Sequence, residues 1–267
     1  MAYEEKKAFD DKKYAIREVS ELTGVKPVTL RAWQRRYSLI QPERTEKGHR
    51  LYTDRHLEII REIQGWLAKG VAIGKVKELL GNPDIAPDPN QPPQAIEQVE
   101  AVLSALAQLK SGKVDAIITS VFKEYPLQHV ESLLIEPVME ALIRVKGSSR
   151  TLQRALFQSV MLNRLSSIIE SENKAAHRGH TLVVNLDVAG NTFAWLYCLK
   201  VAERGQRVTM LDGVEDVTGL IDVKWPFDSV ALFSNRALTE NLKDGVQRLK
   251  SQWGEQLHCS PMIEHLT

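Results

Sequence analysis

Four side chains with planar, hydrogen-bonding head groups lie close together near the N-terminus: Arg31, Gln34, Arg35 and Arg36. A guanidinium fork matches the acceptor edge of guanine in the major groove of a duplex, so Arg31 is the first candidate for a base contact. Gln34 and Thr29 are further candidates for base contacts, whereas Arg36 suits a phosphate. These residues offer the chemistry of nucleic-acid recognition. The alternative is a basic helix whose charges are merely solvated.

The elements expected to carry these side chains are two short helices joined by a tight turn. An amphipathic stretch from Ile16 to Thr23 predicts the first helix, and Gly24 stands where a helix end often needs a left-handed residue. Pro27 opens the second helix, with Thr29 in its first turn. Two helices so closely joined, with guanidinium groups on the second, predict a helix-turn-helix that reads DNA.

A glycine-bearing turn between two short extended runs follows the second helix, over residues 43–52. It predicts a basic wing, whose cations contact phosphates and the minor groove and so position the protein without specifying sequence. Trp33 has two interpretations, a core side chain or a contact beside the phosphates. The residues expected to contact DNA are Tyr14, Arg17, Thr29, Arg31, Trp33, Gln34, Arg35, Arg44, His49, Arg50 and Tyr52.

Charge is unevenly distributed along the chain. Residues 12–80 hold fifteen Lys or Arg against eight Asp or Glu, a net +7, so the rest carries −6 within a total of +1. A basic front joined to an acidic back suggests that only one half meets phosphates.

Composition narrows the class of protein further. Hydrophobic residues make up 43% and charged residues 26%, which is ordinary for a globular chain, and no apolar run reaches membrane-spanning length. Residues 1–11 lack the apolar core of a secretory signal and are expected to form a flexible tail. The two cysteines, Cys198 and Cys259, fit a reducing compartment, so a cytoplasmic location is expected.

The pattern of apolar residues divides the chain into parts. Residues 12–80 are predicted to form the winged module, which is completed by apolar residues at helical spacing between 57 and 80. Residues 81–94 hold five prolines and no apolar periodicity, which predicts a linker. Apolar positions recur every three or four residues over 95–178 and predict a cap of four helices.

The period changes from Thr181 onward. Strand-like runs at 181–187, 207–211 and 229–233 alternate with helical patterns at 192–203 and 239–253. This alternation predicts a small, open, parallel, flavodoxin-like α/β domain over residues 179–267. The predicted fold class is therefore multidomain: an all-α winged helix-turn-helix with a small β wing, a helical-bundle cap, and the α/β domain.

Three motifs in the front segment resemble those of the MerR family of winged-helix bacterial transcription regulators. They are Y-x-I-x-E-V from Tyr14, T-L-R-x-W at 29–33 and G-H-R-L-Y at 48–52. The longer strings P-V-T-L-R-A-W-Q-R-R-Y and W-L-A-K-G-V-x-I-G-K-V-K-x-L-L are similar to one branch, in which a helical cap and a cobalamin-binding-like α/β domain follow the reader. That branch includes light-sensing cobalamin repressors and MlrA-like regulators that switch on curli and biofilm genes in Gram-negative bacteria.

The resemblance makes a chemical demand on the α/β domain, because cobalamin-binding members place a histidine under the cobalt in a D-x-H-x-x-G motif. Here Asp187 is present, but Ala189 stands at the histidine position and Thr192 at the last glycine. Alanine has no lone pair to offer cobalt, so that ligation is impossible. Light-sensing members also carry a Glu-His pair in the cap, where Ala155 and Leu156 align. We therefore expect a degenerate cobalamin-binding-like domain without a cofactor, as in the MlrA-like members.

Other candidate sites in the sequence are weak. His177 and His180 have a spacing that can chelate a metal but lack a third ligand close by. The glutamates between 131 and 140 have no nucleophile or acid beside them, and Gly190 alone is a poor phosphate cradle. We expect neither a metal site nor an enzyme.

The sequence thus predicts a sequence-specific, DNA-binding transcription regulator, an activator of curli, biofilm or stress genes that works without cobalamin. Its expected partners are double-stranded promoter or operator DNA, RNA polymerase indirectly, and a second copy of the chain, with no membrane. MerR regulators usually dimerise through a long helix, which prolines at 83–93 would break, so the C-terminal half should form the homodimer.

Three alternatives remain open. The first is a repressor and the second a sensor of another ligand in the vestigial cobalamin pocket. The third, remote one is a corrinoid-carrying methyltransferase subunit. Ala189 and the DNA-binding front argue against that last assignment.

Overall fold

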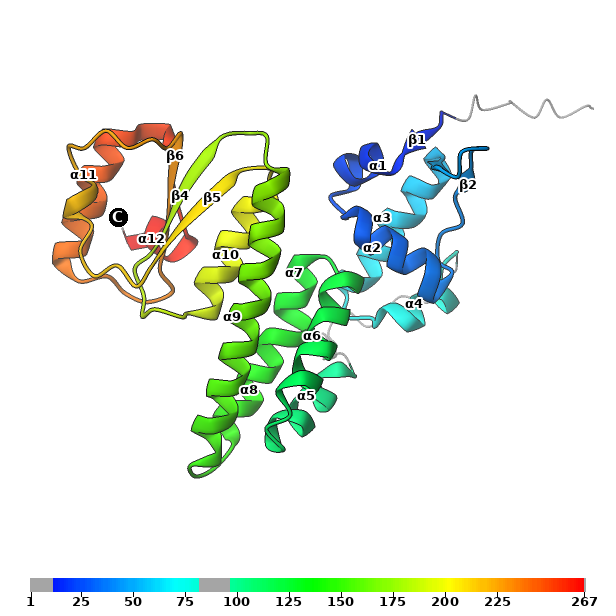
Figure 1. Cartoon of the computed structure of the whole chain (residues 1–267), viewed down its shortest axis with the longest axis horizontal. Helices are drawn as coiled ribbons and strands as arrows, with labels where there is room; N and C mark the ends of the chain where they lie inside the picture. The colour runs from blue at the N-terminus through cyan, green and yellow to red at the C-terminus, as the bar shows by residue number, and fades with distance from the viewer. Residues whose placement is uncertain (1–11, 82–96, 267) are drawn as a thin grey trace, which may run out of the picture. The chain divides into compact units, whose positions relative to one another are not determined.

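The computed structural model describes residues 12–81 and 97–266, which form two compact units that divide after Arg150 (Figure 1). The predicted tail at 1–11 lies outside the described residues, as does the proline-rich stretch apart from Gly81. No described helix is both long and apolar enough to cross a membrane.

The first unit begins with the predicted pair of helices. Helix α1 (Ile16–Thr23) ends at Gly24, whose φ of 71° is the left-handed geometry that glycine adopts without steric cost. Helix α2 (Pro27–Ala32) continues directly into a single π-helical turn, η1 (Trp33–Tyr37). The two form one continuous reading helix, residues 27–37, as the sequence predicts.

The wing is a three-stranded antiparallel sheet of β1 (Tyr14–Ala15), β2 (Glu43–Arg44) and β3 (Arg50–Tyr52), in the order β1-β3-β2. The turn between β2 and β3 needs Gly48, which has a φ of 79° and donates its N–H to the carbonyl of Thr45 at 2.8 Å. The sequence predicts the extended runs on either side of this turn but misses β1, which is only two residues long.

Two helices complete the winged module, α3 (Asp54–Ala68) and α4 (Ile73–Leu79). The side chain of His56 accepts from the N–H of Thr53 at 2.9 Å and so caps the start of α3. The apolar face of α3 is buried as its helical spacing predicts, through Leu57, Ile60, Ile63, Trp66 and Leu67.

Residues 97–144 of the first unit are mostly helical, and they pack in part against the reading helix through α6. They comprise α5 (Gln98–Ala107), α6 (Ser111–Glu124), α7 (Leu127–Val130), a π turn η2 (Glu131–Ile135) and α8 (Glu136–Arg144). The cap predicted over 95–178 is therefore divided, because nearly all of the long helix α9 (Ser149–Ala175) falls in the second unit.

Helix α9 is tied to the α/β part by side chains that pair with main-chain groups. The Asn173 amide donates to the carbonyl of Val208 at 3.0 Å and accepts from the same residue's N–H at 2.7 Å. Gln158 donates to the carbonyl of Gly190 at 2.7 Å. These bonds account for the grouping of α9 with the sheet, which apolar periodicity alone cannot reveal.

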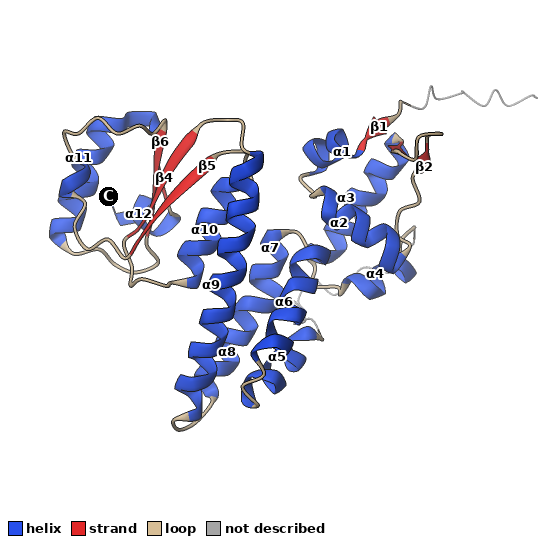
Figure 2. Cartoon of the chain, in the orientation of Figure 1, coloured by secondary structure: helices blue, strands red, loops and turns tan. Residues whose placement is uncertain are grey.

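The second unit is built on a parallel sheet of four strands in the order β5-β4-β6-β7. Figure 2 shows β4 between β5 and β6. The strands are β4 (His180–Asn185), β5 (Arg207–Asp212), β6 (Ser229–Phe233) and β7 (Leu257–Cys259). A first strand flanked on both sides by later ones is the flavodoxin-like order, which confirms the predicted fold class. The short edge strand β7 was not predicted.

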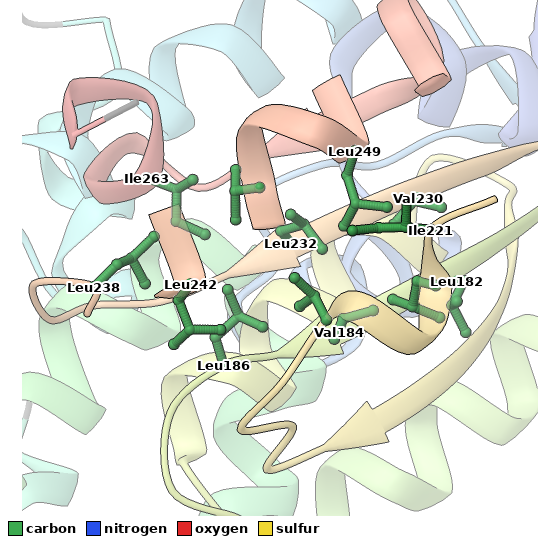
Figure 3. Close-up of a cluster of buried hydrophobic side chains, with 13 residues drawn as sticks. Leu182, Val184, Leu186, Ile221, Val230, Leu232, Leu238, Leu242, Leu249 and Ile263 are labelled. Carbon is green, nitrogen blue, oxygen red and sulfur yellow. The ribbon is translucent and has the colours of Figure 1, made fainter. Parts of the chain in front are cut away.

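Helices lie on both faces of this sheet. Helix α10 (Thr192–Ala202) packs on β4 and β5, on the side of α9, while α11 (Glu240–Trp253) and α12 (Pro261–Leu266) lie on the other side (Figure 1). Two single turns, η3 (Thr218–Leu220) and η4 (Gly254–Gln256), complete the connections. Alternate residues of β4 and β6 meet α11 in the buried cluster of Figure 3, which includes Val184 and Leu232 from the sheet and Val246 from the helix.

Candidate nucleic-acid interface

The reading helix separates its side chains into an inner and an outer face, as the helical period requires. Leu30 and Trp33 are fully buried, and they hold the helix in the unit. Arg31 and Arg35 are exposed on the outer face, and Gln34 is half-buried between them. The side chains chosen from the sequence for base recognition therefore include a set that shares one accessible face.

The wing reaches this face through a specific hydrogen bond. The Nε of Arg50 donates to Oε1 of Gln34 at 2.7 Å, joining β3 to the reading helix across 16 residues of sequence. The sheet register sets Arg50 opposite Arg44. Because Gln34 is held through its oxygen, its amide NH₂ keeps both donor positions for another partner.

The electrostatics of this cluster favour an anion. Partial burial lowers the pKa of Arg50, and the nearby charges of Arg44, Arg31 and Arg35 lower it further, against an opposing contribution from Tyr52. Positive charges that lie this close repel one another, and a phosphate placed among them would relieve that repulsion. The four arginines from helix and wing therefore form one anion-attracting surface, which we call the arginine surface.

Other predicted contacts are exposed as a DNA contact requires. Arg17 on α1 and His49 in the wing turn have exposed side chains. Glu43 of β2 forms an exposed ion pair with Lys13 at 2.7 Å, so the negative charge of this wing residue is balanced by a lysine. These positions remain predictions for DNA contact.

Two of the predicted contacts are corrected by the structure. Trp33 is fully buried and its indole Nε1 donates to the backbone carbonyl of Glu124 at 2.7 Å, so it belongs to the core. Thr29 is 2% exposed, so almost none of its surface is accessible to a base edge. Both lie on the inner face of the helix, where burial rather than recognition selects the residue.

The two wing tyrosines are also more enclosed than a phosphate contact requires. Tyr14 is 8% exposed, and its hydroxyl donates to Asp54 at 2.7 Å, a bond that is the main cause of its raised pKa. Tyr52 is 1% exposed, and burial raises its pKa. Its hydroxyl is buried and lacks a hydrogen-bond partner among the described residues. In this conformation neither hydroxyl is offered to DNA.

Sequence reasoning missed the contact that Arg36 makes. Its guanidinium pairs with the carboxylate of Glu124 on α6, and also donates to the hydroxyl of Ser120 at 2.6 Å. Arg36 is thus directed to a residue of the same chain, although it follows Arg35 immediately in sequence. No local signal identifies a partner 88 residues away.

Asp187, the first residue of the stretch that the sequence comparison set against the cobalamin motif, is buried among partners within the α/β domain. Asp187 is 4% exposed, and its carboxylate accepts from Ser234, Asn191 and the N–H of Asn235 at 2.7–3.0 Å. Arg236 closes the set with an ion pair at 3.1 Å. The carboxylate of Asp187 is therefore fully engaged by the protein's own groups.

The loop after β4 is also packed against the loop after β5. A Cβ at Gly213 would lie only 2.8 Å from the Cβ of Ala189, and Asp212 accepts from the N–H of Gly190 at 2.8 Å and the indole of Trp195 at 3.0 Å. With an alanine methyl at the ligand position, these residues do not fit a cobalt ligated from below. Among the described residues, no three His, Cys, Asp or Glu side chains gather for another metal.

Comparison with known proteins agrees with these features. Residues 14–82 match the profile of the MerR HTH family regulatory proteins. The HTH-type transcriptional regulator MlrA of Escherichia coli is 32% identical over 92% of this chain and 96% of its own length. The HTH-type transcriptional repressor CarH of Myxococcus xanthus is 24% identical over 90% of this chain and 85% of its own. The mercuric resistance operon regulatory protein of Bacillus cereus matches over 26% of this chain and 52% of its own length, with 32% identity. The chain belongs to the MerR family and is a DNA-binding transcription regulator.

Proposed function

We propose that the reading helix enters the major groove of a specific promoter and that the wing lies on the flanking backbone. The observation that carries this proposal is the arginine surface, Arg31, Arg35, Arg44 and Arg50, with Gln34 held at its centre by the bond from Arg50. A helix with two guanidiniums on its outer face and an oriented amide has the donors that base edges accept.

Individual side chains divide this task. Arg31 contacts a base edge, and Gln34 presents its free NH₂ to a base or a phosphate. Arg44 and Arg50 neutralise phosphates, with Arg17 and His49 at the margins, so they set affinity and register more than sequence preference.

The chain acts as a homodimer joined through its C-terminal half, which supports recognition of a pseudo-palindromic site. It activates transcription without cobalamin, by reshaping promoter DNA so that RNA polymerase engages it. The resemblance to MlrA-like regulators supports control of curli, biofilm or stress genes. Ala189 and the engaged carboxylate of Asp187 support independence from cobalamin.

Repression is the second candidate, because two relatives from Myxococcus xanthus carry the name of transcriptional repressors. Either outcome uses the same DNA contacts. They differ in the effect on transcription at the bound promoter, which residues of the reader do not determine.

Genome-wide footprinting with transcript measurement in a deletion strain tests the proposal. The expected result is a small set of bound sites that share a motif with two-fold symmetry. Transcripts of the genes beside these sites should fall when the regulator's gene is deleted. Transcripts that rise instead would establish repression, and footprints without a shared motif would refute sequence-specific recognition. Purified protein mixed with cobalamin should emerge colourless from gel filtration, and a stable coloured complex would refute cobalamin independence.

A further inference from the structure

The back of the reading helix is bonded to one residue of helix α6, Glu124. This glutamate is 3% exposed, and its carboxylate accepts from the hydroxyl of Tyr37 at 2.5 Å and of Ser120 at 2.7 Å, besides pairing with Arg36. Its backbone carbonyl accepts from the indole of Trp33 at 2.7 Å. Three residues of one helical turn therefore converge on a single residue of α6.

The spacing of Trp33, Arg36 and Tyr37 explains how three side chains reach one partner, because residues at i, i+3 and i+4 lie on one face of a helix. In η1 the hydrogen bonds run from each residue to the fifth before it, which widens the turn. Trp33, Arg36 and Tyr37 then lie on the side of the helix that faces α6, away from Arg31 and Arg35. Turns of this kind are concentrated at functional sites, and here the turn coincides with the contact.

Tyr125, the residue after Glu124, adds a second connection to the winged module. The hydroxyl of Tyr125 accepts from the N–H of Ile73, the first residue of α4, at 3.2 Å. The short segment Glu124–Tyr125 thus bonds both the reading helix and α4 of the winged module. Removal of this segment would leave buried donors on two elements without acceptors.

The ion pair is built so that loss of either partner is costly. The side chain of Glu124 is 4% exposed, whereas that of Arg36 is 51% exposed. A carboxylate so deeply buried needs its cation, because an unpaired charge away from water is strongly unfavourable. Arg36 can be hydrated after the contact opens, but Glu124 can be hydrated only if α6 and the reading helix separate.

We propose that Glu124 is a positioning residue for DNA recognition, which fastens the back of the reading helix to α6. The reading helix then moves together with α6, and the arginine surface keeps a fixed orientation relative to α6. The proposal rests on the proposed function, because orientation matters only if the reader binds DNA. In a dimer, a fixed reader restricts the spacing of half-sites that both copies can occupy.

The first test measures the contact itself, without DNA. Hydrogen exchange of residues 27–38 is compared in full-length wild type, Glu124→Gln and a control, Glu140→Gln, which removes the same charge from an exposed position on α8. Exchange in this segment should rise at least fivefold in Glu124→Gln and stay unchanged in the control. Equal exchange in all three proteins would refute the contact as a fastening.

A double-variant cycle guards against simple misfolding of Glu124→Gln. Arg36→Met alone leaves a buried charge unpaired, while Arg36→Met combined with Glu124→Gln leaves none. We expect faster exchange of residues 27–38 in the Arg36→Met single variant than in the double variant. Additive effects of the two substitutions would overturn the pairing on which the proposal depends.

The second test addresses positioning. Wild type and Glu124→Gln are titrated with an in vitro selected duplex and with the same duplex after insertion of five base pairs between its half-sites. We expect the wild-type preference for the selected spacing to shrink at least fivefold in Glu124→Gln and to persist in Glu140→Gln. An unchanged preference beside increased exchange would refute the positioning role. Failure of wild type to prefer any sequence would instead refute the proposed function, and the exchange and cycle results would still decide the contact.

Discussion

Arg50 is expected to have two separable roles, as a charge on the arginine surface and as the donor that holds Gln34. Replacement by alanine removes both roles, whereas replacement by lysine keeps the charge but loses the Nε donor that lies 2.7 Å from Gln34. The two variants should therefore differ in kind, in salt dependence for Arg50→Ala and in sequence preference for Arg50→Lys.

The size of the first effect follows from counterion release. Each phosphate contact contributes about 0.9 to the slope of log affinity against log salt, so its loss changes the response to a fourfold rise in salt by about 3.5-fold. A dimer loses one contact in each copy, which raises that change to about 12-fold. As salt rises from about 50 to about 200 mM, the affinity of Arg50→Ala for DNA should therefore fall about 12-fold less than that of wild type. This difference should be the same on selected and random duplexes.

The second effect is the energy of one hydrogen bond. A bond of about 0.5–1.5 kcal/mol corresponds to about 2- to 12-fold in affinity, and Arg50→Lys should show this loss on the selected duplex while its salt slope stays that of wild type. Arg44→Lys is the matched control, since Arg44 lies opposite in the sheet register and its side chain is exposed.

Fluorescence anisotropy titrations over a series of salt concentrations separate these outcomes. A wild-type salt slope in Arg50→Ala would refute the phosphate contact. An Arg50→Lys variant that discriminates between selected and random duplex as wild type does would refute the role of the bond to Gln34.

Further predictions concern other side chains. Arg31→Ala should weaken binding to the selected duplex by about 1–3 kcal/mol in gel-shift titrations and leave binding to random duplex much less affected; equal losses on both would contradict a base contact. Trp33→Ala should lower the free energy of unfolding in urea by about 3–5 kcal/mol, because Trp33 is fully buried, and Trp33→Phe should lower it less. Arg35→Met should reduce the salt slope of DNA binding whereas Arg36→Met should not, since Arg36 is paired with Glu124 and Arg35 is exposed; equal slopes would contradict this division. Burial raises the pKa of the Cys198 thiol to about 12 from an ordinary 9.0, so the folded state holds its proton longer than the unfolded state. The contribution of this thiol to folding stability is full below about pH 9 and is lost as the pH rises toward about 12. At about pH 8 the thiol should react with Ellman's reagent only after the protein unfolds.

Local signals explain the success of the sequence predictions in the reader. Gly24 and Pro27 fix the end of one helix and the start of the next by their own backbone preferences, whatever surrounds them. The turn at Gly48 is equally local. The strands β4, β5 and β6 were predicted because they are long enough to show an apolar run, whereas β7 has only three residues, none of them fully buried.

Contacts distant in sequence explain the failures. Trp33 had two interpretations because an indole suits a core and a phosphate flank equally well. The acceptor that decides between them, the carbonyl of Glu124, lies 91 residues further along the chain. Tyr52 is expected to contact DNA because of its place in the wing, yet it is 1% exposed. In each case the residue type was compatible with recognition, and only the packing of other elements determined what it could reach.

Arg35 and Arg36 show how strongly the position on a helix determines what a side chain can reach. They are consecutive and chemically identical, but successive residues on a helix point in different directions. One guanidinium therefore joins the arginine surface and the other reaches Glu124. Composition counts both as positive charges available to DNA, although the second is already neutralised by a buried carboxylate. The electrostatic attraction of this module for a duplex is accordingly smaller than its net charge suggests, because a charge paired within the protein adds little to it.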